Sequence, residues 1–180
     1  MGESALDVLT REHQELRELF ANLGDEAADR ASVWLEIVKQ ITTHVAVERS
    51  FLYPLLKRQL HMAGLATELR HDYKQMEHLL VLSERRKINS PDMPDIALQL
   101  LGVFQDHQER CESSLLPAMR DHMDQADLEE LGAKMRGAEN VILSHPHPHL
   151  LALGPVYRGT TRFASAWPLR KRSVAGRMAR

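Results

Sequence analysis

A histidine and a glutamate four residues apart, His44 and Glu48, place the strongest constraint on how this chain can fold. On an α-helix, residues four positions apart lie on the same face, so the imidazole and the carboxylate can point at one position. The segment HVAVERSFLYP (44–54) resembles HQERCESSLLP (107–117), which shares the His, a Ser at +6, a Leu at +8 and a Pro at +10. Two matching helical segments predict two halves of one helical bundle, a fold that builds carboxylate-rich metal sites in its core.

Four long stretches with helical spacing of apolar residues predict the helices of that bundle, at about 4–23, 29–60, 64–87 and 94–117. Ser4 and Asp7 have the spacing of a capping box at the first helix. A shorter helix is expected at about 124–136, with Gly137 as its cap. The predicted fold class is all-α: an antiparallel up-down-up-down four-helix bundle with a short fifth helix and an irregular basic C-terminal tail.

Charge divides the 180-residue chain into a bundle domain at 1–140 and a tail at 141–180. The first part has 16 basic and 25 acidic residues, while the tail has seven basic residues, no acidic ones and a His-Pro alternation at 145–149. A solvated terminus is the favoured interpretation of the tail, and no specific nucleic acid is predicted as a partner. One cysteine, the lack of a signal-like segment and the lack of a membrane span predict a cytoplasmic protein.

Three histidines, His13, His44 and His107, each lie in the middle of an apolar stripe on a different predicted helix. A single histidine in such a place is more often a core residue with its hydrogen bonds satisfied. Three of them together with Glu48 favour a metal site instead, because neutral imidazole and carboxylate are common iron ligands.

With these histidines and Glu48 in this order, the chain resembles the hemerythrin-like (HHE cation-binding) family, over roughly residues 5–120. That family has the ordered pattern His, His-x-x-x-Glu, His, His-x-x-x-Glu over four helices. The resemblance assigns His13, His44, Glu48 and His107 as metal ligands. The matching segments are DVLTREHQELRELF, HVAVERSFLYP, LRHDYKQMEHLL and HQERCESSLLPAM, followed by a helix DLEELGAKM that is similar to one after the bundle in bacterial relatives.

The resemblance implies a non-haem diiron centre that binds or senses O2, iron or another small oxidant. An enzyme that consumes peroxide or nitric oxide at the same centre is the first alternative. A metal-depleted helical scaffold is the second alternative. Two iron ions are expected, and the possibilities of one bound ion or none stay open. No residue in the sequence identifies a substrate, and the oligomeric state is not predicted.

Two positions depart from the family pattern. Cys111 stands where the fourth motif has Glu, and Glu112 follows at +5 from His107, which on a regular helix is about 140° away. Glu112 therefore requires a local distortion of the helix, while Cys111 is either a thiolate ligand or a small buried hydrophobic residue.

The ligand from the third helix is the second departure, because His71 and His78 share one face. Family-like spacing after Tyr53-Pro54 favours His71, and apolar neighbours favour His78. The more apolar face carries Leu69, Tyr73, Met76 and Leu80. If that face is inward, both histidines point to solvent and the site lacks a histidine from this helix.

Overall fold

The computed structural model describes residues 2–25, 27–86 and 88–143, and the predicted basic tail therefore lies outside the described residues from 144 onward. The described residues form helices and no strands. The helices are α1 (Ala5–Leu23), α2 (Arg30–Arg58), α3 (Ala63–Glu84), α4 (Met93–Arg110), α5 (Leu116–His122) and α6 (Gln125–Leu143). A π-helical turn at Cys111–Leu115, here called the π-turn, joins α4 to α5 without a break.

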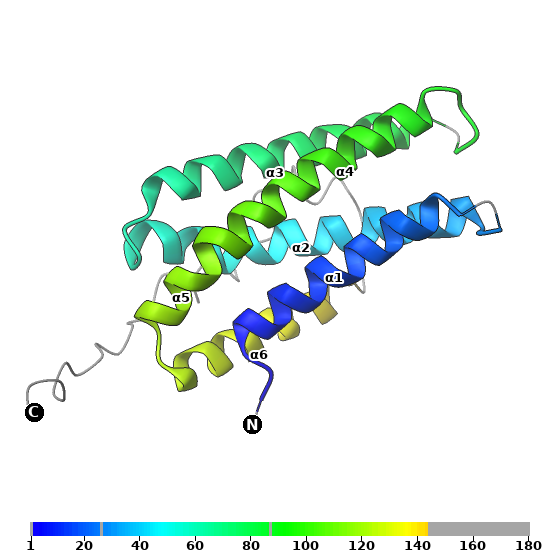
Figure 1. The fold of residues 1–180 in the computed structure, drawn as a ribbon. Coiled ribbons are helices and arrows are strands. Elements are labelled where there is room, and N and C mark those ends of the chain that lie inside the picture. Colours follow the sequence, from blue (N-terminus) through cyan, green and yellow to red (C-terminus); the bar gives the residue numbers. More distant parts are fainter. Residues whose placement is uncertain (1, 26, 87, 144–180) are drawn as a thin grey trace, which may run out of the picture.

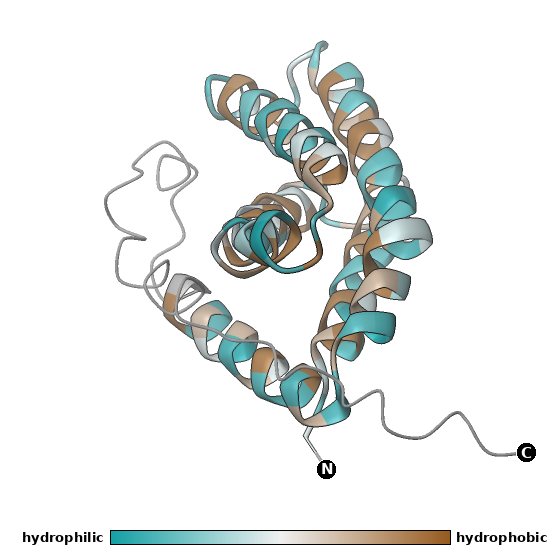
Figure 2. Cartoon of the chain, turned by 90° about the vertical axis from the view of Figure 1, so that its left-hand side faces the viewer, coloured by the Kyte–Doolittle hydropathy of each residue, from teal (hydrophilic) through white to brown (hydrophobic). Residues whose placement is uncertain are grey.

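The helices form the predicted antiparallel bundle, in which α2 is the central element (Figure 1). Helix α2 packs against α1, α3 and α6, and α3 packs against α4. Hydrophobic residues lie mainly on the helix faces that turn toward other helices (Figure 2). The all-α prediction is confirmed, and the central position of α2 explains why an uninterrupted run from Ile41 to Glu48 is buried.

Local sequence explains where the first two helices begin. Ser4 and Asp7 form the predicted capping box, because the Ser4 side chain accepts from the Asp7 N–H and the Asp7 carboxylate accepts from the Ser4 N–H. Asp29 caps α2 by accepting from the N–H groups of Ala31 and Ser32. Firmly set helix starts fix the register of α1 and α2, and with it the direction in which their histidines point.

Helix α6 extends beyond the predicted end at Arg136 and passes through Gly137 to Leu143. The prediction of Gly137 as a helix cap is wrong, because a glycine is tolerated inside a helix that tertiary packing holds. Gly132 has a more specific role: a Cβ there would lie 2.5 Å from the Glu3 carbonyl oxygen. The missing side chain therefore lets α6 approach the start of α1 closely.

None of the described helices combines the length and the apolar character needed for a transmembrane span.

Candidate metal centre

Four buried side chains from three helices converge in the middle of the bundle. His13 comes from α1, His44 and Glu48 from α2, and His107 from α4, and one donor atom from each lies within 4.8 Å of all the others. His44 Nε2 is 3.1 Å from His107 Nε2, and His107 Nε2 is 3.1 Å from Glu48 Oε2. Each of the four is at most 1% exposed. The structure thus brings together the residues of the first, second and fourth predicted motifs.

His13 is the most telling member of this cluster, because it is fully buried and neither ring nitrogen has a hydrogen-bond partner among the described residues. A buried polar atom without a partner costs about 1–3 kcal/mol. Nearly all such atoms in folded proteins are paired with protein, water or an ion. The free nitrogens of His13, facing His44 and His107 with ring centroids 5.1 and 5.7 Å away, fit a bound cation.

The outer nitrogen of His44 is held by Glu12, a buried residue of α1 that the sequence analysis did not single out. His44 Nδ1 lies 2.6 Å from Glu12 Oε2, which makes Nδ1–H the donor and leaves the Nε2 lone pair facing the cluster. A carboxylate behind a metal-binding histidine fixes the orientation and tautomer of the ring. Its sequence signal was only an acidic residue next to His13, which is common on helix surfaces.

Glu12 has a second acidic neighbour, Glu139 of α6. Burial raises the pKa of Glu12 to about 7, with Glu139 and Arg11 opposing the rise and Glu48 adding to it. Burial and the contact with Glu12 raise the pKa of Glu139 to about 8. Two carboxyl groups in contact favour sharing a proton over carrying two charges. Helix α6 therefore supports the position of His44 indirectly, because Glu139 contacts Glu12 and Glu12 holds His44.

Burial keeps His13 and His44 neutral, while Glu48 is held ionised. Burial lowers the pKa of His13 to about 3, with His44 adding to the shift, and burial lowers the pKa of His44 to about 4. Burial alone would raise the pKa of Glu48, but His44, His107 and His13 outweigh it and hold the pKa below its usual value. Neutral imidazoles around an ionised carboxylate are the protonation states that a metal requires.

The π-turn provides the local distortion that the +5 position of Glu112 required. Its wider winding, with the N–H of Leu116 donating to the carbonyl of Cys111, turns both positions after Arg110 toward α1 and α2. Glu112 Oε1 lies 3.6 Å from His13 Nδ1 and accepts a 2.7 Å hydrogen bond from Gln108. The Glu112 side chain is 43% exposed, so it lies at the rim of the cluster.

Cys111 lies deeper than Glu112. Its Sγ is 3.6 Å from His107 Nε2 and 3.8 Å from Glu48 Oε1. Burial raises the pKa of the thiol well above its usual value, and Glu48 adds to the rise. The side chain is therefore a neutral thiol in the structure as it stands, within reach of a metal bound at the cluster.

Helix α3 turns its apolar face inward, so the structure brings neither His71 nor His78 to the cluster. Both histidines are exposed, and His71 Nε2 is 2.6 Å from Gln75 on the same surface. The physical reason is that Leu69, Tyr73, Met76 and Leu80 are buried against the other helices. The apolar stripe fixes the rotation of the helix, and a histidine on the opposite face cannot reach the core.

Tyr73 and Asp72 occupy the cluster-facing side of α3 instead, and the sequence analysis did not propose either as a site residue. The Tyr73 ring lies 5.6 Å from that of His107, and its buried hydroxyl has no hydrogen-bond partner among the described residues. Burial raises the pKa of this phenol well above its usual value, and Glu48 adds to the rise. Asp72 Oδ2 lies 4.0 Å from His107 Nδ1 and is bound by Arg110.

The geometry as a whole is that of a cation site with donors from three of the four bundle helices. Imidazole nitrogen and carboxylate oxygen dominate, and a thiol and a phenol lie beside them. Apolar residues of the same core are buried as well, among them Leu16, Phe20, Ile41, Phe51 and Phe104. A low-polarity shell strengthens the electrostatic interactions inside it and limits access to small molecules.

Comparisons with known proteins agree with this geometry. The hemerythrin HHE cation binding domain model matches residues 4–119. The chain is similar to a DNA nickase of Nostoc sp. (strain PCC 7120), with 25% identity over 138 residues that cover 76% of this chain and 39% of that protein. It thus spans about two fifths of the length of that relative. A crystal structure of a hemerythrin HHE cation binding domain-containing protein from Mycobacterium kansasii has the same fold, with a TM-score of 0.66, 21% identity, and coverage of 89% of this chain and 98% of that one.

Proposed function

Because the chain belongs to the hemerythrin HHE cation binding domain family, we propose that its buried cluster holds iron and that the protein binds or senses O2, iron or another small oxidant. One observation carries this proposal: three imidazoles and a carboxylate converge within 4.8 Å, and neither ring nitrogen of His13 has a hydrogen-bond partner among the described residues. Imidazole with carboxylate is a ligand set that suits iron, and a bound iron supplies redox chemistry and an open position for a small oxidant.

The donors that surround the cluster support a proposal of two ions. His13, His44, Glu48 and His107 suffice for one ion. A second ion needs further donors, and Glu112 at the rim, the Tyr73 phenol and the Cys111 thiol lie beside the four. The third helix thus offers a phenol where the family pattern has a histidine. Metal analysis distinguishes two ions from one or none.

The remaining residues of the site orient and shield the ligands. Glu12 holds the proton on His44 Nδ1 and thereby aims Nε2 inward. Phe104 is fully buried and its ring lies 6.0 Å from that of His13, so it closes one side of the cluster to water. These two contacts keep His44 and His13 in place before a metal arrives, which reduces the rearrangement that binding requires.

Burial also decides the size of the molecule that can reach the cluster. With His13, His44, Glu48 and His107 at most 1% exposed, a diatomic or triatomic molecule fits the site better than a polymer does. The name of the Nostoc relative raises DNA cleavage as an alternative, but a phosphodiester backbone would need an open metal site. We therefore favour a small oxidant, and a plasmid-nicking assay with the iron-loaded protein tests the alternative.

The decisive experiment measures metal in protein purified from iron-replete cells. We expect close to two iron atoms per chain and a near-ultraviolet band of oxygen-bridged iron. Iron near background in correctly folded protein would refute the proposal and favour a metal-free scaffold. A reversible spectral change under O2 supports binding or sensing, whereas turnover of peroxide or nitric oxide at this centre would identify an enzyme.

A further inference from the structure

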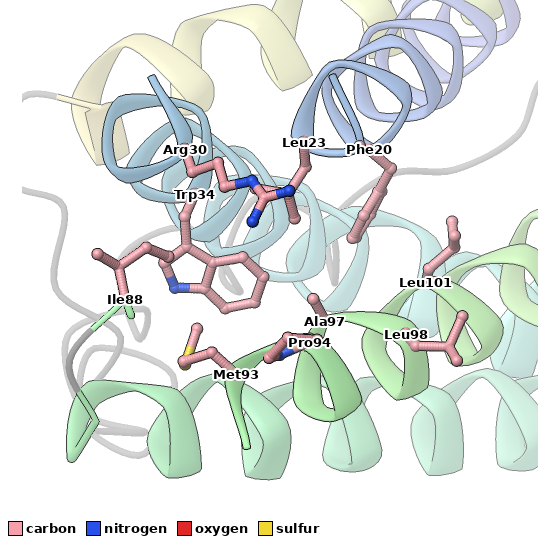
Figure 3. Close-up of a pocket in the computed structure, with 11 residues that line it drawn as sticks. Phe20, Leu23, Arg30, Trp34, Ile88, Met93, Pro94, Ala97, Leu98 and Leu101 are labelled. Carbon is pink, nitrogen blue, oxygen red and sulfur yellow. The ribbon is translucent and has the colours of Figure 1, made fainter. Parts of the chain in front are cut away.

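An apolar pocket of about 310 Å³ lies at the end of the bundle where α1 ends and where α2 and α4 begin. Its walls come from three helices and the loop before α4, and ten of its lining residues are drawn in Figure 3 with their labels. Small-molecule sites are mostly apolar hollows of roughly 300–1,000 Å³ with a few polar groups that orient the ligand. The volume therefore fits a small ligand.

Among the residues that the structure describes, Arg30 is the only charged one in the lining of this pocket. Its guanidinium extends over the opening, near Trp34 and Leu23, with Met93 and Pro94 across from it (Figure 3). No ion pair joins Arg30 to another residue in the part of the chain that the structure describes. The nearby acidic Asp92 is bound to Arg86, and Asp29 caps α2. An arginine without a counter-ion above an apolar hollow fits a ligand with an apolar body and one negative head.

We propose that this pocket binds an amphipathic monocarboxylate of medium chain length, with its carboxylate on Arg30 and its hydrocarbon chain between Trp34 and Leu101. Burial of apolar ligand surface supplies most of the binding free energy, at roughly 25 cal/mol per Å². The single cation selects the anionic head, because a cationic amphiphile of the same length would meet Arg30 with like charge.

The pocket also adjoins the metal centre. Phe20 lines the pocket and stacks on Phe104 with ring centroids 6.0 Å apart. Phe104 in turn contacts the rings of His13 and His44, at 6.0 and 6.4 Å. The rings of Phe20 and Phe104 therefore lie between a ligand in the pocket and the imidazoles of the metal centre. Binding itself needs no metal, so its test is independent of the function proposed above.

Trp34 in the pocket wall makes the proposal testable by fluorescence. The chain has two tryptophans, Trp34 and Trp167, so the full-length Trp167→Phe variant reports on Trp34 alone. Decanoate is the probe, and decyltrimethylammonium and 1-decanol have the same chain length with positive and no charge. We expect a saturable change in Trp34 emission with decanoate at a concentration at least tenfold lower than with decyltrimethylammonium.

Arg30→Gln should weaken decanoate binding roughly two- to fivefold, the loss expected for one exposed ion pair. The matched control is Arg58→Gln, an exposed arginine at the other end of α2, which should leave the affinity unchanged. Ala97→Phe fills the pocket and should weaken binding at least tenfold, with circular dichroism confirming that the variant is folded.

Four outcomes would overturn the proposal. The first is no saturable change in Trp34 emission with decanoate, which would show that the pocket does not take this ligand. The second is equal affinity for decanoate and 1-decanol, which would indicate a site for uncharged apolar molecules. The third is an Arg30→Gln variant that binds decanoate as tightly as the Arg58→Gln control. The fourth is unchanged binding in a folded Ala97→Phe variant, which would place the ligand elsewhere.

Discussion

The segments 44–54 and 107–117 share four residues at matching positions, but only the first is a regular α-helix. In the first, Glu48 at +4 is fully buried and contacts both His44 and His107. In the second, the π-turn presents a buried Cys111 at +4 and a rim carboxylate, Glu112, at +5. The two halves therefore differ in the depth at which a carboxylate is placed, although each has one.

The two histidines that begin these segments also differ in their support. His44 Nδ1 is held by Glu12 at 2.6 Å. His107 Nδ1 has no hydrogen-bond partner among the described residues, and Asp72 lies 4.0 Å away. The α2 half of the centre is therefore the more rigidly organised one. If this asymmetry governs metal binding, substitutions in the two halves should differ in their effect on bound iron.

The largest effect is expected from Glu48→Gln. The substitution keeps the shape of the side chain but removes the buried charge that faces three imidazoles. We expect iron affinity to fall by at least ~100-fold, beyond the 10- to 100-fold loss typical of outer-sphere changes. Iron per chain, measured after dialysis against a weak chelator, checks this. The control is Glu109→Gln, an exposed glutamate two positions after His107, and equal iron in the two variants would contradict the assignment.

A smaller loss, roughly tenfold in iron affinity, is expected from Glu112→Gln. Glu112 reaches His13 from the rim and is 43% exposed, so its interaction with a cation is partly screened by solvent. The same chelator competition measures it. If Glu112 is the second carboxylate, Cys111→Glu adds no iron, whereas a gain of iron in Cys111→Glu would show that the natural second half lacks a working carboxylate.

These two variants address the part of the site that sequence reasoning could not settle. The buried faces of α1, α2 and α4 followed from apolar spacing, and so did the convergence of His13, His44 and His107. The π-turn was expected only as an unspecified distortion, because no residue type encodes a π-helical hydrogen bond. The rotation of α3 depends on which of its two candidate faces packs against the other helices. In the structure, the apolar face that carries Tyr73 is the buried one.

Two further features depend on contacts between residues far apart in the sequence. Glu12 becomes a site residue only because His44, 32 positions later, lies against it. Helix α6 continues through Gly137 because packing against α1 and α2 stabilises its later turns, while local sequence predicts an end there. Most helix positions and the inward faces of α1, α2 and α4 are thus local properties that a single sequence predicts, whereas supporting contacts between helices are not.

A pH dependence should distinguish the α2 half through Glu12 and Glu139. Their pKa values of about 7 and 8 in the folded protein exceed the ordinary value of 4.5, so the folded state retains protons that the unfolded state loses. Stability from this pair is present at low pH and is lost as pH rises from about 4.5 to about 8. In metal-free protein, Glu139→Gln should therefore gain a few °C in melting temperature relative to wild type between pH 5 and pH 8.

The histidines do not obscure this comparison. The lowered pKa values of His13 and His44 destabilise the fold below pH ~6.5, but they do so in both proteins and largely cancel in the difference. A melting-temperature difference that stays constant from pH 5 to pH 8 would contradict the shared proton. Glu130→Gln, an exposed carboxylate on the same helix, controls for the loss of a negative charge on α6.

The smallest effect is expected from Cys111→Ser, which tests whether the thiol at +4 takes part in the second half or only packs there. A metal-bound thiol must be deprotonated, yet burial and Glu48 raise the pKa of Cys111, so ligation has to overcome both. We therefore expect packing. The Ser hydroxyl is smaller and can donate to Glu48, so the cost should be about 1 kcal/mol, or a fall of roughly 2–4 °C in melting temperature. The iron spectrum should remain unchanged. Loss of a thiolate charge-transfer band together with iron would instead show that the second half binds metal through sulfur at +4, and that the rim carboxylate of Glu112 is secondary.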